Sequence, residues 1–542
     1  MKFIRVSSLP AEMDEDTIYL EYSYWDDYGF CTTFTAHYKY EQLGIVKIGC
    51  KSLQSKVSMG SSSNNYASYS VQELIPLDNE FYNLPKDFFS LGQDVSYYKN
   101  INHYFPEEKI NYLTSMKDLS FNFSGFKELY DYGEACLLNS LMRNLHVSNV
   151  EQFHRIATGG SELTPYNFSF EYMNEHIEID VFPDAALPSN IHVLIGRNGV
   201  GKTWLLHNMV FSLLKNSGVN FDVDKSEKYS ISEDFLINCR KDSFAGIIGL
   251  SFSVFDDALS IEINKEKSEE SGLTQKQIDD FKKKYRYIGL VDKNQKNGKI
   301  KTKSIDELSV EFIETLKKIK GNRSKIDLYM ETCSFLNADP MFKENGFIEI
   351  LNQYFSSRKS LPRQRNQNDI DPLSGIEKSF KRLSSGHMII ILSLTLLAES
   401  IFEKTIVLID EPETHLHPPL LSTYIRALSH LLIKRNAVAI IATHSPIILQ
   451  EVPRSCVNKI NRTGRKMSFN RIETQTFATS VDTLTREVFG LEVVKTGFYQ
   501  LIEEKLGRNF DSTYRKFDNE VGFLGQLLIQ SLLKKRESDE EN

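Results

Sequence analysis

Apolar and polar positions alternate near the start of the chain and then change to a helical spacing. Over residues 17–50, aromatic and β-branched residues alternate with polar ones between turn residues, which predicts several strands. The stretch MGSSSNNYASYS at 59–70 has the composition of a polar loop. Between residues 85 and 150, apolar residues recur at helical spacing, as in GEACLLNSLMRNL. We therefore predict a β-rich N-terminal lobe joined to a helical segment over residues 1–164.

The rest of the chain contains strongly apolar strands that are followed directly by polar residues. IHVLI precedes GRNGVGKT, TIVLI precedes DEPE, and VAIIA precedes THSP, while the apolar helix MIIILSLTLLA follows LSSGH. Unbroken apolar runs are typical of parallel strands that helices cover on both faces. We predict an α/β core built from segments 165–255 and 381–455. A charged hairpin and helical insertion at 256–380 separates them. A helical region at 456–542 follows, predicted to bind a partner protein; the alternative is packing on the α/β core.

The insertion carries a basic stretch. Residues 276–303 contain ten Lys or Arg residues against three Asp, and the Asn-Gly at 297–298 predicts a hairpin turn. Lysines there could neutralise phosphates of a nucleic acid, and Tyr285 and Tyr287 could stack on unpaired bases. The alternative is a solvated hairpin face without a ligand.

Composition narrows the classes of protein that fit. The chain has 542 residues, of which 41% are hydrophobic and 25% charged, and its net charge of −8 gives no global attraction to nucleic acid or membrane. None of the six cysteines forms a CxxC pair, which argues against structural zinc and a disulfide framework. The first residues lack the apolar core of a signal peptide, and the longest apolar run, 388–398, is shorter than the roughly 20 residues of a membrane span. We therefore expect a cytoplasmic protein without a membrane partner.

The segment at 196–203 fits the phosphate-binding pattern G-x4-G-K-[ST] and lies between an apolar strand and an apolar helix. Glycines allow successive backbone N–H groups to turn toward phosphate oxygens, and the helix N-terminus adds a favourable dipole. The alternative is a glycine-rich turn without a ligand. We expect Lys202 to reach the β- and γ-phosphates and Thr203 to bind Mg²⁺. The predicted ATP-binding residues here are Gly196, Arg197, Asn198, Gly199, Val200, Gly201, Lys202, Thr203 and Trp204.

Two further strands end in residues suited to nucleotide hydrolysis. TIVLI ends in Asp410 and Glu411, of which the first would hold Mg²⁺ and the second would orient and deprotonate the attacking water. The alternative is a strand that ends in two solvated acids. VAIIA is followed by Thr443-His444-Ser445, and His444 becomes a candidate for sensing the γ-phosphate, although a lone histidine at a strand end is more often structural. We predict Glu411 and His444 as the catalytic residues.

The order of the P-loop, LSSGH at 383–387, Asp410-Glu411 and His444 resembles the ATP-binding cassette superfamily, in the branch of SMC-, RecF- and OLD-like ATPases. The resemblance implies an ABC-type P-loop ATPase in which Ser384, Ser385 and Gly386 contact the γ-phosphate of ATP held by another subunit. It therefore implies a homodimer, or a higher even oligomer, with ATP and Mg²⁺ between subunits.

Residue types in the signature suit this role. Serines can cap the helix, glycine allows close approach, and the apolar helix behind presents a positive N-terminus. Two departures from the typical Leu-Ser-Gly-Gly-Gln are Ser385 and His387, which replace the first Gly and the Gln. The expected Q-loop glutamine is also missing, and Asp256 or Asp257 stands in that region.

DEPETHLHP, ATHSPIILQEVPRS, TLTREVFGLEVVKTGFYQLI and DFFSLGQDVSYYKN resemble the ATPase subunit, PtuA, of Septu-type antiphage systems. That resemblance implies a separate HNH nuclease as partner and, in some systems, a retron reverse transcriptase with its multicopy single-stranded DNA. No Asp-x-Asp follows Cys456, so we expect no Toprim nuclease in this chain, and the histidines form no HNH-like cluster. We expect His415 and His417 to be loop residues at the dimer contact, with a metal site as the alternative.

Three functions remain open at this point. The first is a regulatory ATPase that controls a partner nuclease in antiphage defence. The second is a RecF- or SMC-like ATPase of DNA repair or chromosome maintenance, although 256–380 cannot build a long coiled-coil arm. The third is a transporter cassette, against which the N-terminal lobe, the insertion and the DEPETHLHP loop argue.

Overall fold

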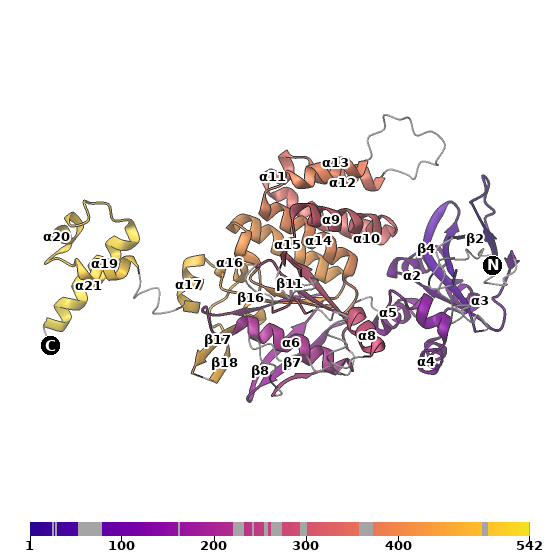
Figure 1. The fold of residues 1–542 in the computed structure, drawn as a ribbon, viewed down its shortest axis with the longest axis horizontal. Coiled ribbons are helices and arrows are strands. Elements are labelled where there is room, and N and C mark those ends of the chain that lie inside the picture. Colours follow the sequence, from indigo (N-terminus) through magenta and orange to yellow (C-terminus); the bar gives the residue numbers. More distant parts are fainter. Residues whose placement is uncertain are drawn as a thin grey trace.

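The computed structural model contains an N-terminal lobe, a central α/β body and a C-terminal group of helices, arranged along the long axis of the molecule (Figure 1). The residues that the structure describes are 1–23, 27, 30–51, 79–160, 163–219, 232, 234–240, 243–253, 258–261, 274–292, 301–356, 372–464, 466–489 and 497–540. The polar loop predicted at 59–70, the Asn-Gly turn at 297–298 and the acids at 256 and 257 lie outside them.

The N-terminal lobe is a six-stranded sheet covered by helices, as the alternating sequence predicts. The strand order is β5-β1-β2-β3-β4-β6, and its residues form a hydrophobic core of their own. The strands are β1 (Lys2–Val6), β2 (Thr17–Tyr22), β3 (Thr33–Tyr38), β4 (Glu41–Cys50), β5 (Glu80–Phe81) and β6 (Phe88–Gly92). The helices are α2 (Val95–Tyr104), α3 (Lys109–Ser115), α4 (Phe123–Tyr132), the π-helical turn η1 (Leu137–Leu141) and α5 (Val147–Ala157).

A seven-stranded sheet forms the centre of the molecule, in the order β12-β11-β15-β16-β9-β17-β18. All neighbours are parallel except the last pair. The strands are β9 (Ile191–Ile195), β11 (Ile247–Ser251), β12 (Tyr285–Gly289), β15 (Ile406–Asp410), β16 (Val438–Thr443), β17 (Val457–Thr463) and β18 (Lys466–Arg471). Because the strands are parallel, β9, β15 and β16 end at the same edge, and β16 lies between the other two. Residues that follow these three strands therefore meet at one place.

The two faces of the central sheet carry different layers. Successive side chains of β15 alternate, so that Ile406 and Leu408 pack on one face while Val407 and Ile409 pack on the other. The first face is covered by α6 (Lys202–Asn216), by α8 (Gln275–Lys284) and by an antiparallel sheet of β10 (Phe235–Asn238), β7 (Tyr166–Tyr172) and β8 (Glu175–Val181). The second is covered by α14 (Ser385–Ser400), α15 (Pro418–Lys434), α16 (Pro446–Leu449) and α17 (Val481–Phe489). Figure 1 shows α14 and α6 on opposite sides of the strands.

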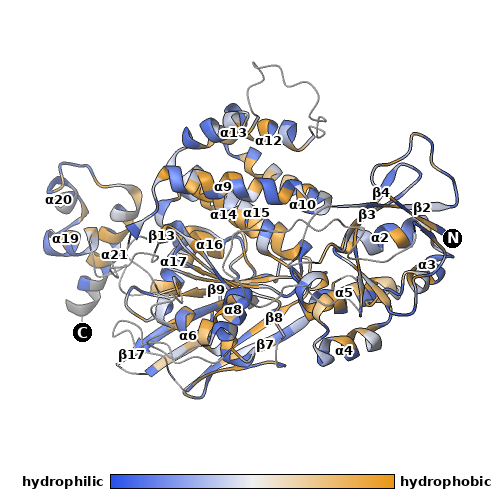
Figure 2. Ribbon diagram, turned by 45° about the vertical axis from the view of Figure 1, so that its right-hand side comes forward, coloured by the Kyte–Doolittle hydropathy of each residue, from blue (hydrophilic) through white to orange (hydrophobic). Residues whose placement is uncertain are grey.

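Helices of the insertion stack above α14 and α15 and share their hydrophobic core. Their apolar faces turn toward this core, and the hydropathy colouring in Figure 2 shows both apolar and polar faces on α9 and α10. The insertion contains α9 (Ile305–Lys320), α10 (Arg323–Ser334), the 3-10 turn η2 (Phe335–Ala338), α11 (Pro340–Glu344), α12 (Phe347–Ser356), α13 (Pro372–Lys381) and the antiparallel pair β13 (Val291–Asp292) and β14 (Lys301–Thr302). The helical character predicted for the insertion is thus confirmed in its described residues.

Several residues of the basic stretch have partners inside the fold. Tyr285 is 4% exposed and its hydroxyl donates to the Leu259 carbonyl, because β12 pairs with β11 of the central sheet. Lys284 is buried, and Arg286 pairs with Glu399 at 2.6 Å. The expectation that Tyr285 stacks on unpaired bases is therefore wrong. Tyr287 is half-buried, and its hydroxyl donates to the Ser251 carbonyl at 3.3 Å.

The region after residue 456 differs from the helical expectation at its beginning. β17 and β18 form a hairpin there, with Gly464 at φ +62° between them. Few apolar residues mark these strands, since the hairpin ends the sheet and, of its apolar residues, only Val457, Ile460 and Met467 are buried. Helices follow as expected: α17, α19 (Phe498–Glu504), α20 (Phe510–Arg515) and α21 (Phe523–Glu540). Among the described helices, none has the length and hydropathy needed to span a bilayer.

Candidate active site

The P-loop connects β9 to α6 at the carboxyl edge of the central sheet. Gly199 and Gly201 have φ angles of +80° and +99°, which L side chains rarely adopt. A Cβ atom on Gly201 would also approach the Met467 side chain of β18 to 2.4 Å. Arg197, Asn198 and Gly199 are exposed, so the outer backbone of the loop is accessible to a ligand. The loop thus has the conformation that a phosphate-binding turn requires.

Lys202, the first residue of α6, is 5% exposed. Its ammonium group donates to the carbonyls of Gly196 and Arg197, each at 3.2 Å, and lies 4.0 Å from Glu411 Oε1. Burial lowers its pKa, although the carboxylates of Glu411 and Asp410 act in the opposite direction. The ammonium group is therefore held at the loop, next to the acids of β15.

Thr203 and Asp410 meet across the site. The Thr203 hydroxyl donates to Asp410 Oδ2 at 2.8 Å, and Asp410 is 2% exposed at the end of β15. A hydroxyl and a carboxylate are hard oxygen ligands of the kind that Mg²⁺ prefers, with water and phosphate completing its coordination. Within the described ranges no group of three or more His, Cys, Asp or Glu residues could hold a metal. A shared site with nucleotide phosphates therefore fits this donor set better than a site made by protein alone.

Glu411 follows Asp410 and adopts φ +44°, an unfavourable conformation for a residue with a side chain. Its backbone N–H donates to the Ala442 carbonyl of β16 at 2.9 Å, which fixes the turn. Its carboxylate is 33% exposed, 3.6 Å from His444 Nδ1 and 4.0 Å from Lys202 Nζ. The predicted base thus lies beside both the P-loop lysine and the predicted sensor histidine.

Glu413 is a site residue that the sequence did not single out. Its Oε1 accepts hydrogen bonds from the Thr443 hydroxyl at 2.5 Å and from the His444 backbone N–H at 2.9 Å. The same oxygen lies 3.2 Å from His444 Nδ1, and the carboxylate is 9% exposed. Glu413 therefore fixes the turn after β16 and orients His444. The DEPE sequence contains it, but its partners lie 30 residues away in the chain, on another strand.

The signature residues begin α14. Ser384 is the N-cap and accepts from the His387 backbone N–H at 3.5 Å, and Ser384 and Ser385 are exposed. Gly386 is buried, and a Cβ atom there would approach the His415 carbonyl to 2.8 Å. Since α14 and α6 cover opposite faces of the sheet, these residues do not join the cluster around Lys202 within the described part of the chain.

The remaining predicted residues have structural partners. Trp204 is half-buried and packs edge-on against Tyr172, with ring centroids 5.2 Å apart. His415 Nε2 makes a hydrogen bond with the Phe252 carbonyl at 3.1 Å, and His417 caps α15. A contact between Trp204 and ATP stays a prediction. Contacts of His415 and His417 with another subunit stay predictions as well.

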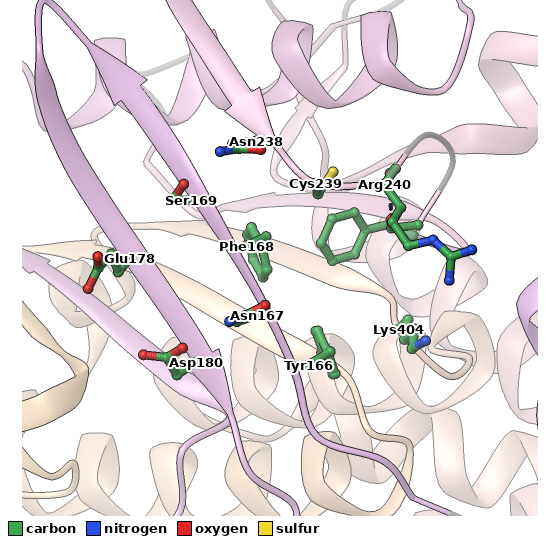
Figure 3. A pocket seen from close by; sticks show the side chains of 12 residues that line it. Tyr166, Asn167, Phe168, Ser169, Glu178, Asp180, Asn238, Cys239, Arg240 and Lys404 are labelled. Carbon is green, nitrogen blue, oxygen red and sulfur yellow. Dashed lines mark hydrogen bonds between the residues drawn. The ribbon is translucent and has the colours of Figure 1, made fainter.

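A hollow with a volume of about 660 Å³ lies against β7 and β8. Figure 3 shows Glu178 and Asp180 on one side of it and Arg240 and Lys404 on the other. Lys404 precedes β15 whereas Asp410 ends it, so β15, a strand of roughly 15 Å, separates the hollow from the P-loop edge. The hollow is therefore distinct from the nucleotide site.

A model of the AAA ATPase domain family AAA_15 matches residues 292–449, which include the signature, the two acids of β15 and His444. Among solved structures, an ATP-binding cassette of an ABC transporter in its ADP conformation is 13% identical, covering 61% of this chain and 98% of that chain, with a TM-score of 0.24. An Smc head domain with an extended coiled coil, bound to the C-terminal domain of ScpA and derived from Pyrococcus furiosus, is 12% identical over 61% of this chain and 100% of that chain, with a TM-score of 0.24.

Because these scores are low, the α/β P-loop assignment depends on the strand order and site geometry above, which confirm the predicted fold class. Protein ea59 of Escherichia phage lambda is 32% identical over 550 residues, covering 98% of this chain and 97% of the phage protein. The chain carries an AAA ATPase domain and belongs to the family of the phage lambda protein ea59.

Proposed function

We propose that this protein hydrolyses ATP at a site that two copies of the chain complete, and that this cycle controls a partner nuclease in antiphage defence. One observation carries the enzymatic part: Lys202 and His444 lie within 4.0 Å of Glu411. A cation for phosphate, a carboxylate base and a histidine are the groups that in-line hydrolysis of a phosphoanhydride needs.

Each side chain has a separate task in the proposed reaction. Lys202 binds phosphate oxygens, and the backbone N–H groups of the P-loop surround them. Glu411 accepts a proton from the attacking water, while Glu413 holds His444 toward the terminal phosphate. Thr203 and Asp410 would hold Mg²⁺, which supplies charge stabilisation for the phosphates when bound.

The arrangement of α6 and α14 supports a site shared between copies. The exposed Ser384 and Ser385 begin a helix on the face opposite to α6, so they present their hydroxyls away from the lysine of the same chain. A helix N-terminus that exposes two serines suits an anion. A second copy with its P-loop against this surface would supply that anion as ATP, in a symmetric dimer.

The regulatory part of the proposal draws on the C-terminal helices. α19, α20 and α21 have a small hydrophobic core of their own. Their surface exposes apolar side chains, namely Phe498, Leu501, Phe523 and Leu527. Such a surface suits a protein partner. We propose an HNH-type nuclease as that partner, in some systems together with a retron reverse transcriptase and its single-stranded DNA.

Purification of the protein from its own operon tests this role. We expect native mass measurement to show an even number of copies bound to an HNH nuclease, with or without reverse transcriptase and single-stranded DNA. An assembly of this chain alone would contradict the nuclease role. It would favour the second candidate, a RecF-like repair ATPase, for which DNA should stimulate hydrolysis.

A further inference from the structure

A chain of hydrogen bonds connects the signature serine to the helical insertion. The Ser384 hydroxyl lies 2.6 Å from His387 Nδ1, and His387 Nε2 lies 3.0 Å from Asp339 Oδ1. Asp339 precedes α11 and also accepts from the backbone N–H groups of Met341 and Phe342. His387 and Asp339 are each 6% exposed at their side chains. The His387–Asp339 pair is therefore buried, and the exposed Ser384 joins it at the surface.

The chemistry of the carboxylate determines the proton positions. An ionised carboxylate only accepts, so His387 Nε2 must carry a proton to bond Asp339. In a neutral imidazole Nδ1 then has only a lone pair, and the Ser384 hydroxyl must donate its proton to it. Partial burial opposes ionisation, but the hydrogen bonds from His387 and Met341 hold the pKa of Asp339 below its ordinary value. In this state Ser384 points its proton inward and has none for a phosphate oxygen.

A second proton on the imidazole reverses the direction of the hydrogen bond between Ser384 and His387. Nδ1–H then donates to Ser384 Oγ, so the hydroxyl proton turns outward and can donate to an anion. We propose that His387 and Asp339 are positioning residues for the shared ATP site: His387 takes up a proton from solvent when Ser384 engages the phosphate of the other copy. This inference rests on the proposed function, because the phosphate belongs to the nucleotide of a second chain.

The groups around His387 support it as the residue that takes up the proton. The charged or titratable groups that the structure places against it are Asp339, before α11, and His417 at the start of α15, whose ring centroid is 6.5 Å away. Phe342 packs edge-on against the imidazole at 4.9 Å. Asp339 Oδ1 accepts from His387 Nε2–H in both protonation states of the imidazole, so the added proton goes to Nδ1. Association of two copies with ATP should therefore consume protons and weaken as pH rises.

The test is the pH dependence of ATP-driven self-association, measured by sedimentation from pH 6.5 to 8.5 in full-length Glu411→Gln protein to prevent turnover. With His387 present, we expect the dissociation constant to rise by up to about tenfold per pH unit for each proton taken up. His387→Gln should still associate, but with the pH dependence that ATP alone confers. His430→Gln is the matched control, since His430 also faces a carboxylate, at 3.3 Å, but away from the signature.

Asp339→Asn is a second variant, because it keeps the oxygen that caps α11 while removing the charge. It should move the midpoint of the pH dependence to lower pH. Equal pH profiles in the His387→Gln and parent proteins would overturn the inference and leave the shared site intact. Failure of the parent to associate with ATP at any pH would instead overturn the proposed function, and this inference with it.

Discussion

Replacement of Glu411 by Gln is expected to reduce the ATPase kcat by at least about 100-fold, the lower end of what a general base contributes. Gln has the shape of Glu and keeps the turn at φ +44°, but it cannot accept the proton of water. ATP binding should be unchanged or tighter, because a negative charge 4.0 Å from Lys202 is removed before the phosphates arrive. Steady-state turnover and equilibrium binding of ATP, measured on the same protein, separate the two effects.

Glu411→Asp is the companion variant for this prediction. It keeps the charge but withdraws the carboxylate by one methylene group, so it should retain more turnover than the Gln variant. Turnover of the Gln variant within about tenfold of the parent would assign the base to another residue, since a general base contributes more than that. Loss of both binding and turnover would indicate damage to the fold instead.

Lys202→Ala should abolish tight binding of ATP. The lysine is nearly inaccessible to solvent, and its amine lies 4.0 Å from Glu411 Oε1, inside the proposed site. Truncation of one partner of a buried charged contact, here the lysine against phosphate, costs about 2–5 kcal/mol. This corresponds to a dissociation constant for ATP roughly 30 to 5,000 times larger. Titration with a fluorescent ATP analogue measures this change.

Lys215→Ala on the last turn of α6 is the matched control, because Lys215 is exposed and lies outside the loop. It should bind ATP as the parent does. If both substitutions changed the affinity equally, Lys202 would not be the phosphate ligand.

The motifs that the sequence revealed are those whose residues are contiguous. The P-loop, Asp410-Glu411 and His444 each follow an apolar strand directly, and parallel pairing then brings the strand ends together. The pairing of His387 with Asp339 joins residues 48 positions apart, and depends on how the insertion folds back onto α14. Periodicity carries no information on such a contact.

Two parts of the central sheet were not predicted as such, for related reasons. The residues of β12 were predicted to belong to the basic insertion, because their neighbours in the chain are lysines. In the structure β12 completes the edge of the central sheet. The β17–β18 hairpin has too few apolar residues for a strand pattern, although Gly464 marks its turn. Both elements lie at or beside an edge of the sheet, where burial on one side leaves a weak signal in the sequence.

The claim that two copies share each ATP site is tested most directly by mixing two inactive variants. Lys202→Ala removes the phosphate ligand, and Ser384→Asp keeps the helix cap but places a negative charge against the partner's phosphates. In a mixed dimer one of the two sites retains both wild-type residues and the other has neither. Because equal mixing makes half of the dimers mixed, it should restore about a quarter of the parental ATPase rate. A mixture no more active than its separate components would contradict the shared site.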